Sequence, residues 1–317
     1  MVSSGQQVAF TTPADAPAWQ RWMVFSPLAR LLFFVALFIP GVKLVTVAMH
    51  ALGWTHGGTP LQVGLGQVIG RIVPALVAYL IVTCLIERRT PTELLSRTAF
   101  SNALIGLAAG TALFSTVAGV LWLLGVYHVI GFNPHANWLT ALLMVGIGAG
   151  VGEEIMFRGA LYRMVEEGLG TWIALAVSAL FFGAVHLGNP GATLWAGAAI
   201  AIEAGLLFGL LYLVTRSLWV CMGLHAAWNF MQGTVYGIPV SGTSADGWLV
   251  STRSGPDWLS GGVFGAEASV VALCLCLLAS AALLAVALRR GLIVPPSWRR
   301  KPQASGLAPL SIPATGG

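Results

Sequence analysis

The sequence predicts an all-α, polytopic membrane protein built as a bundle of about eight transmembrane helices. Of its 317 residues, 57% are hydrophobic and only 9% are charged. A soluble domain carries about 25% charged residues, so this chain has too few charges to cover a surface that faces water. Its apolar residues also come in runs of about 20, the length that a helix needs to cross a bilayer. We therefore expect the lipid bilayer to be the solvent of the folded chain.

Each predicted span is a predominantly apolar run long enough for a membrane helix. In chain order, the predicted spans are 30–53, 66–86, 103–126, 138–165, 171–187, 192–214, 217–235 and 266–288. Residues 1–29 lack the short apolar core and cleavage site of a signal peptide, and we predict that they form a flexible N-terminal arm. The basic, Pro-rich segment 289–317 is predicted to be a disordered tail.

The distribution of basic residues predicts the orientation of the chain. Lys and Arg residues gather on one side, in the N-terminal arm, in the connection 87–97 and after the last span. Because loops rich in Lys and Arg stay on the cytoplasmic side, both termini are expected in the cytoplasm of a multi-pass cell-membrane protein. The net charge of +5 follows from this topology, and no nucleic-acid partner is expected.

Ionisable residues in the predicted spans are concentrated in the fourth to seventh spans. A charge in hydrocarbon is costly, so each such residue is a functional candidate. In the fourth span, Arg158 follows Glu154 by four residues and therefore shares its helix face, which predicts an ion pair. Glu153 points about 100° away from that pair and lacks an evident counter-charge. A buried carboxylate of this kind has the character of a general base. Glu154 and Arg158 could alternatively serve structure alone.

A histidine in the fifth span is expected at the same depth as Glu153. Glu153 precedes the turn at Leu169 by 16 residues, and His186 follows it by 17 residues. At a rise of 1.5 Å per residue, each lies about 25 Å from the turn. In an antiparallel hairpin, the two side chains therefore meet, which predicts a shared site.

The seventh span contributes two further candidates, His225 and Asn229. They are four residues apart on one helix face, and both can donate hydrogen bonds to a developing oxyanion. Glu203, in the middle of the sixth span, could orient His225, although a structural role is an equal alternative.

Four alternating glycines precede the two glutamates of the fourth span. Their spacing gives two overlapping G-x-x-x-G patterns, which in membrane helices allow close helix packing. A dinucleotide-binding interpretation would require a preceding strand and a soluble domain, and neither is predicted. The glycines in question are Gly146, Gly148, Gly150 and Gly152.

Three of these patterns resemble the motifs of the CPBP intramembrane proteases. They are Glu153-Glu154-x-x-x-Arg158, Phe182-x-x-x-His186 and His225-x-x-x-Asn229. That family includes CAAX prenyl endopeptidases of the Rce1 type and bacterial relatives associated with bacteriocin processing and self-immunity. The resemblance covers 137–235 and implies a catalytic core there, with N-terminal transmembrane helices at 30–136. An outward loop and the last transmembrane helix follow at 236–288.

The resemblance also implies a role for each motif residue. Glu153 and His186 would activate the attacking water, and His225 and Asn229 would stabilise the oxyanion. Glu154 and Arg158 would brace the site. The family has been described both as metalloproteases and as glutamate-dependent proteases. We expect no required cofactor, since general-base activation of water needs no metal. If zinc takes part, Glu153, His186 and His225 would supply its three protein ligands.

The expected function is that of an intramembrane endopeptidase acting on membrane-bound peptides or proteins. One alternative is a non-enzymatic immunity or scaffold protein that keeps the same fold. Another is a proton-coupled transporter, because Glu and His also line proton pathways in membranes. The three motifs in order favour the protease. The paired broken helices of two repeats that would favour a transporter are not recognised in this sequence.

Overall fold

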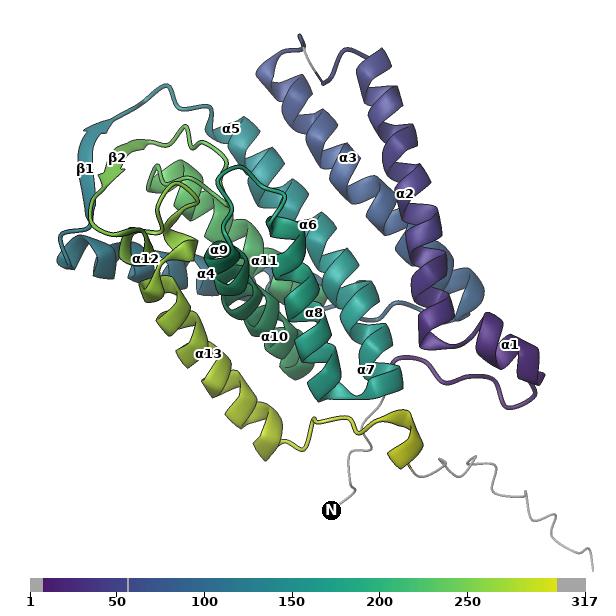
Figure 1. The fold of residues 1–317 in the computed structure, drawn as a ribbon. Coiled ribbons are helices and arrows are strands. Elements are labelled where there is room, and N and C mark those ends of the chain that lie inside the picture. Colours follow the sequence, from purple (N-terminus) through teal and green to yellow (C-terminus); the bar gives the residue numbers. More distant parts are fainter. Residues whose placement is uncertain (1–7, 56, 301–317) are drawn as a thin grey trace, which may run out of the picture.

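The computed structural model describes residues 8–55 and 57–300, and these are mainly helical (Figure 1). Several helices continue into one another through π-helical turns, so that Trp138–Leu169 is one continuous helix. The α-helices are α1 (Ala18–Met23), α2 (Pro27–Ala51), α3 (Pro60–Leu80), α4 (Ala99–Leu123), α5 (Trp138–Ala141), α6 (Ala149–Glu154), α7 (Arg163–Leu169), α8 (Thr171–His186), α9 (Leu194–Ile200), α10 (Leu207–Thr215), α11 (Leu218–Phe230), α12 (Asp257–Ser260) and α13 (Val270–Arg289). The π-helical segments are Ile81–Ile86, Leu142–Gly148, Ile155–Tyr162, Ala201–Leu206 and Met231–Val235.

Six helices of the described chain are long and apolar enough to cross a membrane. They are Pro27–Ala51, Pro60–Ile86, Ala99–Leu123, Trp138–Leu169, Leu194–Thr215 and Val270–Arg289. The two other predicted spans are also helical. However, α8 has only 16 residues, and α11 with its π-helical extension carries His225, Asn229 and Gln232. The protein is thus a polytopic helical membrane protein, as predicted.

Helix α11 lies inside the bundle and packs against α4, α6 and α10. Its contact with α4 is the closest helix pair, because small residues let the two backbones approach. A Cβ added at Gly106 of α4 would lie 2.2 Å from the carbonyl oxygen of Val220 in α11. Such contact is how membrane helices associate, since lipid removes most of the hydrophobic driving force between them. This packing fixes the helix that carries His225 and Asn229.

The glycines before the glutamate pair have the same effect on α6. A Cβ at Gly150 would lie 2.9 Å from the backbone nitrogen of Ala226 in α11, and one at Gly152 would lie 2.9 Å from the carbonyl oxygen of Arg71 in α3. The predicted close packing at these positions is therefore confirmed. It holds the two glutamates between α3 and α11.

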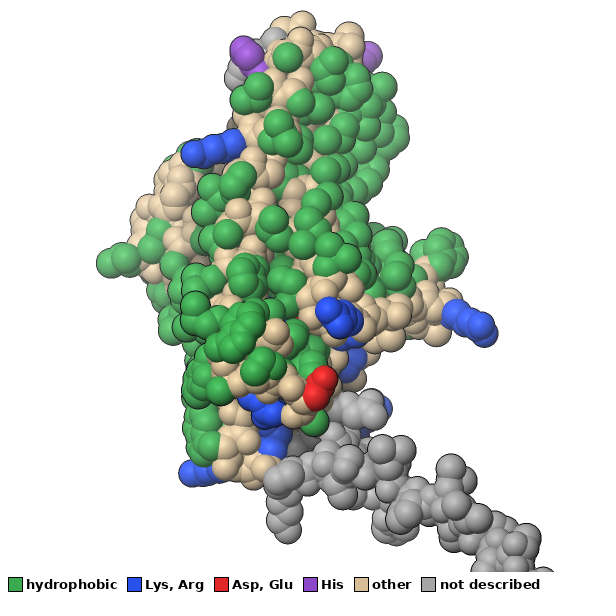
Figure 2. Space-filling view, turned by 90° about the vertical axis from the view of Figure 1, so that its right-hand side faces the viewer, with side chains coloured by type: hydrophobic (Ala, Val, Ile, Leu, Met, Phe, Trp, Pro, Cys, Tyr) green, Lys and Arg blue, Asp and Glu red, His purple; other side chains and the backbone are tan. Residues whose placement is uncertain are grey.

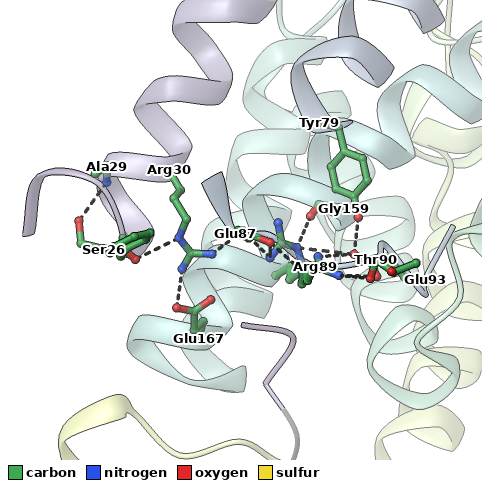
Figure 3. Close-up of polar contacts among 12 residues, drawn as sticks. Ser26, Ala29, Arg30, Tyr79, Glu87, Arg89, Thr90, Glu93, Gly159 and Glu167 are labelled. Carbon is green, nitrogen blue, oxygen red and sulfur yellow. Dashed lines mark hydrogen bonds and ion pairs between the residues drawn. The ribbon is translucent and has the colours of Figure 1, made fainter. Parts of the chain in front are cut away.

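The basic connection 87–97 takes part in a buried network of ion pairs at one end of the bundle (Figure 3). Glu87 accepts hydrogen bonds from Arg30 of α2, Arg89 and Arg163 of α7. Arg30 also pairs with Glu167 of α7. The side chains of Arg30 and Glu87 have no exposed surface. The sequence predicted that this end is basic, but it did not predict that Arg30 and Arg163 are buried.

A second carboxylate, Glu93, completes the network in the same connection. It receives hydrogen bonds from Arg89 and from the hydroxyl of Tyr79 in α3. Burial alone would raise the pKa of Glu93, but the hydrogen bond and charge of Arg89, with the charge of Arg163, outweigh it and lower the pKa to about 2. The network joins α2, α3 and α7 and so anchors one end of the helix that carries Glu153.

Both described ends of the chain meet at this end of the bundle (Figure 1). The short helix Ser297–Arg299 after α13 contacts α7, and Arg300 donates to the backbone carbonyl of Glu167. Within the predicted flexible arm 1–29, residues 18–23 form α1 and α2 begins at Pro27, which differs from an unstructured arm. Residues 1–7, and residues 301–317 of the predicted disordered tail, lie outside the described residues.

The opposite end carries a small antiparallel sheet that the sequence analysis did not predict. Strand β1 (Tyr127–Phe132) pairs with β2 (Leu249–Arg253), which belongs to the predicted outward loop. The loop also holds the turn after α8, since Asn189 donates to the carbonyl of Ser241. It therefore covers the end of α8, the helix that supplies His186.

Candidate functional site

Glu153 and His186 meet in the structure as the hairpin geometry predicted. The Oε2 atom of Glu153, in α6, lies 4.0 Å from Nε2 of His186, the last residue of α8. Both side chains are partly accessible, at 23% for Glu153 and 11% for His186. No donor among the described residues bonds to Oε2 of Glu153. The Oε2 atom itself is buried, and only other parts of the two side chains keep exposed surface.

A backbone hydrogen bond defines the proton position on His186. Its Nδ1 lies 2.7 Å from the carbonyl oxygen of Phe182, one helical turn earlier. A carbonyl can only accept, so Nδ1 carries the proton. In the neutral ring, Nε2 is therefore an acceptor that faces Glu153. Two acceptors 4.0 Å apart suit one water molecule that donates a hydrogen to each.

Glu154 connects Arg158 with His225 in the interior of the bundle. Its Oε1 accepts from Arg158 at 2.9 Å, which confirms the predicted ion pair, and lies 2.9 Å from Nδ1 of His225. Glu154 and Arg158 have no exposed side-chain surface. The carboxylate that orients His225 is thus Glu154. Glu203, which the sequence suggested for this role, forms no hydrogen bond or ion pair with that histidine in the described chain.

Arg158 is also held by aromatic rings and backbone carbonyls. Its guanidinium lies 4.8 Å from the ring centre of Phe182 and 5.0 Å from that of Phe208. It donates further hydrogen bonds to the carbonyls of Ala204 and Gly205. These contacts stabilise a buried cation, because the faces of aromatic rings and carbonyl oxygens both carry partial negative charge. Phe182 therefore serves the site twice, through its ring and through the carbonyl that orients His186.

Asn229 lies one turn after His225 on α11. One amide hydrogen is used, since its Nδ2 donates to the carbonyl of Val145 at 2.8 Å. That bond fixes the orientation of the amide. The second amide hydrogen remains available for a ligand, because a primary amide has two donors.

A small cavity connects the two histidines and Asn229. Its volume of about 30 Å³ is room for about two water molecules. Its lining combines aromatic rings with polar side chains from α8, α11 and the outward loop. Glu153 is not part of the lining and meets it through His186. The polar lining residues are His186, Glu203, His225, Asn229, Ser241 and Glu267.

Two of these, Glu203 and Glu267, form a carboxyl pair that lacks a bonded cation in the described chain. Both are at least 97% buried, and Oε2 of Glu203 has no described hydrogen-bond donor. Glu267 accepts from the hydroxyl of Ser241. Burial raises the pKa of Glu267 to about 7, although that hydrogen bond opposes the shift. Sequence reasoning missed Glu267, because it lies in a short 3-10 helix just before α13, far along the chain from the motifs.

The arrangement does not fit the zinc site considered from the sequence. Nowhere in the described chain do three His, Cys, Asp or Glu side chains form a group that could hold a metal ion. Glu153 and His186 are close, but His225 directs Nδ1 to Glu154. No step is therefore assigned to a metal, and the expectation that none is required stays a prediction.

Comparison with protein families decides the class of the molecule. Residues 134–231 match the model of the type II CAAX prenyl endopeptidase Rce1-like family. This part of the chain is similar to the Rce1-like domain of the CPBP family. The match includes all three motifs and overlaps the predicted core 137–235. The matched family consists of endopeptidases, and this similarity suggests a protease with a peptide substrate. A search of curated proteins finds no match to this chain.

Proposed function

We propose that the protein is an intramembrane endopeptidase in which Glu153 and His186 activate water and His225 with Asn229 stabilises the oxyanion. The observation that carries this proposal is the 4.0 Å separation of the Glu153 carboxylate and the His186 Nε2. Two neighbouring acceptors, without a cation bonded to them in the described chain, are suited to orient one water molecule and to take one proton from it. The substrate is a membrane-bound peptide or protein, and both termini face the cytoplasm.

The first step forms a bond between the water oxygen and the carbonyl carbon of the scissile peptide. Water donates one hydrogen bond to Glu153 and the other to His186, so its lone pair is free to attack. As the carbon–oxygen bond forms, the proton moves to Glu153, and the carbonyl π electrons move to the oxygen. Glu153 then gives that proton to the leaving nitrogen as the carbon–nitrogen bond breaks.

Hydrogen-bond donors on α11 stabilise the negative charge that forms on the carbonyl oxygen. Asn229 can donate its second amide hydrogen to this oxygen. Its first amide hydrogen is bonded to the carbonyl of Val145, which holds the side chain in place. His225 donates Nδ1–H to Glu154. It therefore has a second hydrogen for the oxyanion only as an imidazolium. Preorganised donors of this kind are a major source of catalysis.

The test is peptide cleavage by the purified protein in detergent, measured with a quenched fluorescent peptide library. The Glu153→Gln variant keeps the shape of the side chain but cannot accept the proton. We expect its rate to fall by about 10²–10⁴-fold, the usual contribution of a general base. Glu166→Gln is the matched control. It also neutralises a buried glutamate of the same helix, but about 20 Å away, so it should retain cleavage.

Each assay is repeated with a chelator and then with added zinc. Cleavage that survives the chelator supports the metal-free mechanism. Loss with chelator and recovery with zinc would replace it with a metalloprotease. Equal rates for wild type and Glu153→Gln would remove Glu153 from the mechanism. They would overturn the proposed roles of Glu153 and His186.

A further inference from the structure

An apolar groove lies at the basic end of the bundle, away from the catalytic cavity. Its volume is about 860 Å³, and residues of α1, α2 and α7 line it together with Trp298. A second groove has a volume of about 580 Å³, and Leu169 and Trp298 line both grooves. The two grooves therefore form one apolar surface divided by an indole ring. Ligand sites in proteins commonly have about 300–1,000 Å³.

The side chains around these grooves have the character of a membrane interface. Trp22 and Trp298 are 77% and 67% exposed, and Trp172, in the second groove, is 54% exposed. Exposed tryptophans of membrane proteins concentrate at the level of the lipid headgroups. Figure 2 faces α2 and shows mainly hydrophobic side chains along it, with most Lys and Arg of this face in the lower half. The grooves thus lie where acyl chains meet headgroups.

Two arginines at the groove have no carboxylate partner in the described chain. Arg299 lines the second groove, and its neighbour Arg300 donates only to the backbone carbonyl of Glu167. The Nε of Arg300 is buried and has no described partner. This contrasts with Arg30 and Arg163 nearby, which are paired with glutamates. A phosphate would supply the acceptor oxygens that these guanidinium groups lack.

We propose that this surface binds one anionic phospholipid, with its acyl chains in the two grooves and its phosphate on Arg299 and Arg300. Trp298 separates the chains. The bound lipid links α2, α7 and the segment after α13, because all three supply lining residues. This site is independent of the proposed peptidase activity.

The test uses the full-length protein in nanodiscs that contain phosphatidylcholine and a graded fraction of phosphatidylglycerol. Native mass spectrometry counts the retained lipids. We expect wild type to retain phosphatidylglycerol selectively. Arg299→Gln, and Arg299→Gln with Arg300→Gln, should weaken this preference by about fivefold for each charge removed. Arg299 is exposed, so its single variant tests the site even if the Arg300 change disturbs folding.

The matched control is Arg289→Gln with Arg290→Gln. These residues are also consecutive, exposed arginines at the end of the same helix, but they line neither groove. The control should retain the lipid preference. An equal loss in both double variants would show a general effect of charge and would overturn the proposal, as would the absence of any preference in wild type.

A photo-crosslinking residue at Leu28, in the first groove, identifies the occupant in the full chain. Crosslinks to the acyl chain of phosphatidylglycerol are expected. Crosslinks to residues 301–317 of the same chain would show that the tail fills the groove, and crosslinks to phosphatidylcholine alone would show ordinary lipid solvation. Either of these outcomes would overturn the proposal.

Discussion

The helix Trp138–Leu169 carries buried glutamates in two regions with opposite character. At its basic end, Glu167 pairs with Arg30, and Glu166 pairs with Arg216. Near its middle, Glu154 is paired with Arg158, but Glu153 has only His186 at 4.0 Å. The two glutamates of the basic end are thus each paired with an arginine, whereas the centre leaves one carboxylate without a cation among the described residues. The comparison indicates that glutamates paired with arginine stabilise the helix bundle. A carboxylate without a bonded arginine, such as Glu153, is instead suited to accept a proton in a reaction.

The largest expected effect on stability is at the basic end. Glu87→Gln removes the carboxylate shared by Arg30, Arg89 and Arg163. Removing one partner of a buried ion pair costs about 3–5 kcal/mol, because the other charge remains buried. We expect that loss in the free energy of unfolding, measured by denaturant titration in detergent micelles. The rate of cleavage per folded molecule should be almost unchanged.

Glu166→Gln is the control for this comparison. Its partner Arg216 is 38% exposed, so water can solvate the arginine when the glutamate charge is lost. We therefore expect a smaller loss of stability than for Glu87→Gln. A loss as large as that of Glu87→Gln would contradict the view that burial of the arginines sets the size of the effect.

The next effect is on catalysis and concerns Asn229. Asn229→Asp keeps the shape of the side chain but removes the amide donors, and the added charge repels an oxyanion. Removing one oxyanion donor costs about 10²–10³-fold in kcat. We expect a loss of at least that size with a small change in KM, measured by steady-state peptide cleavage. A rise in KM at unchanged kcat would instead assign Asn229 to substrate binding.

The smallest effect is the pH dependence that Glu267 gives to stability. Its pKa is raised from the ordinary 4.5 to about 7, so the folded state binds more protons than the unfolded state between these values. Stability therefore falls as pH rises through this window, by about 1.4 kcal/mol per unit and about 3 kcal/mol in all. Glu267→Gln should remove this slope in unfolding experiments at pH 4 to 8.

Asp257→Asn is the control for the pH experiment, because Asp257 is an exposed carboxylate close to Glu267 in sequence. It should leave the slope intact. If Glu267→Gln keeps the wild-type slope, Glu267 does not hold the proton in this pH range. The contrast between the two regions then depends on Glu153 alone.

Contacts between residues of one helix, or of one helical hairpin, were predictable from the sequence. Spacing of four residues predicted the Glu154–Arg158 pair, and equal distance from one turn predicted the meeting of Glu153 and His186. Composition and run length predicted the class of fold, which the six candidate membrane helices confirm. These features depend on the regular rise and turn of a helix, which the sequence alone specifies.

Contacts between distant segments were not predictable in this way. The bond from Glu154 to His225, the buried position of Arg30 and the approach of Glu267 to the cavity each join elements far apart in the chain. The pairing of β1 with β2 is of the same kind. The spacing of residues within one helix does not specify which other helix it contacts, because those contacts depend on the packing of the whole bundle.

The sequence by itself determined that the chain is a membrane helical bundle and that Glu153, Glu154, Arg158, His186, His225 and Asn229 are its candidate site residues. The tertiary structure decided which of these are paired and which remain exposed to a small molecule. It also decided that Glu203 and Glu267 share their cavity, and that Arg30 and Arg163 are buried. The physical reason is that helix geometry fixes neighbours within about one turn, whereas burial and ion pairing depend on segments that only the folded bundle brings together.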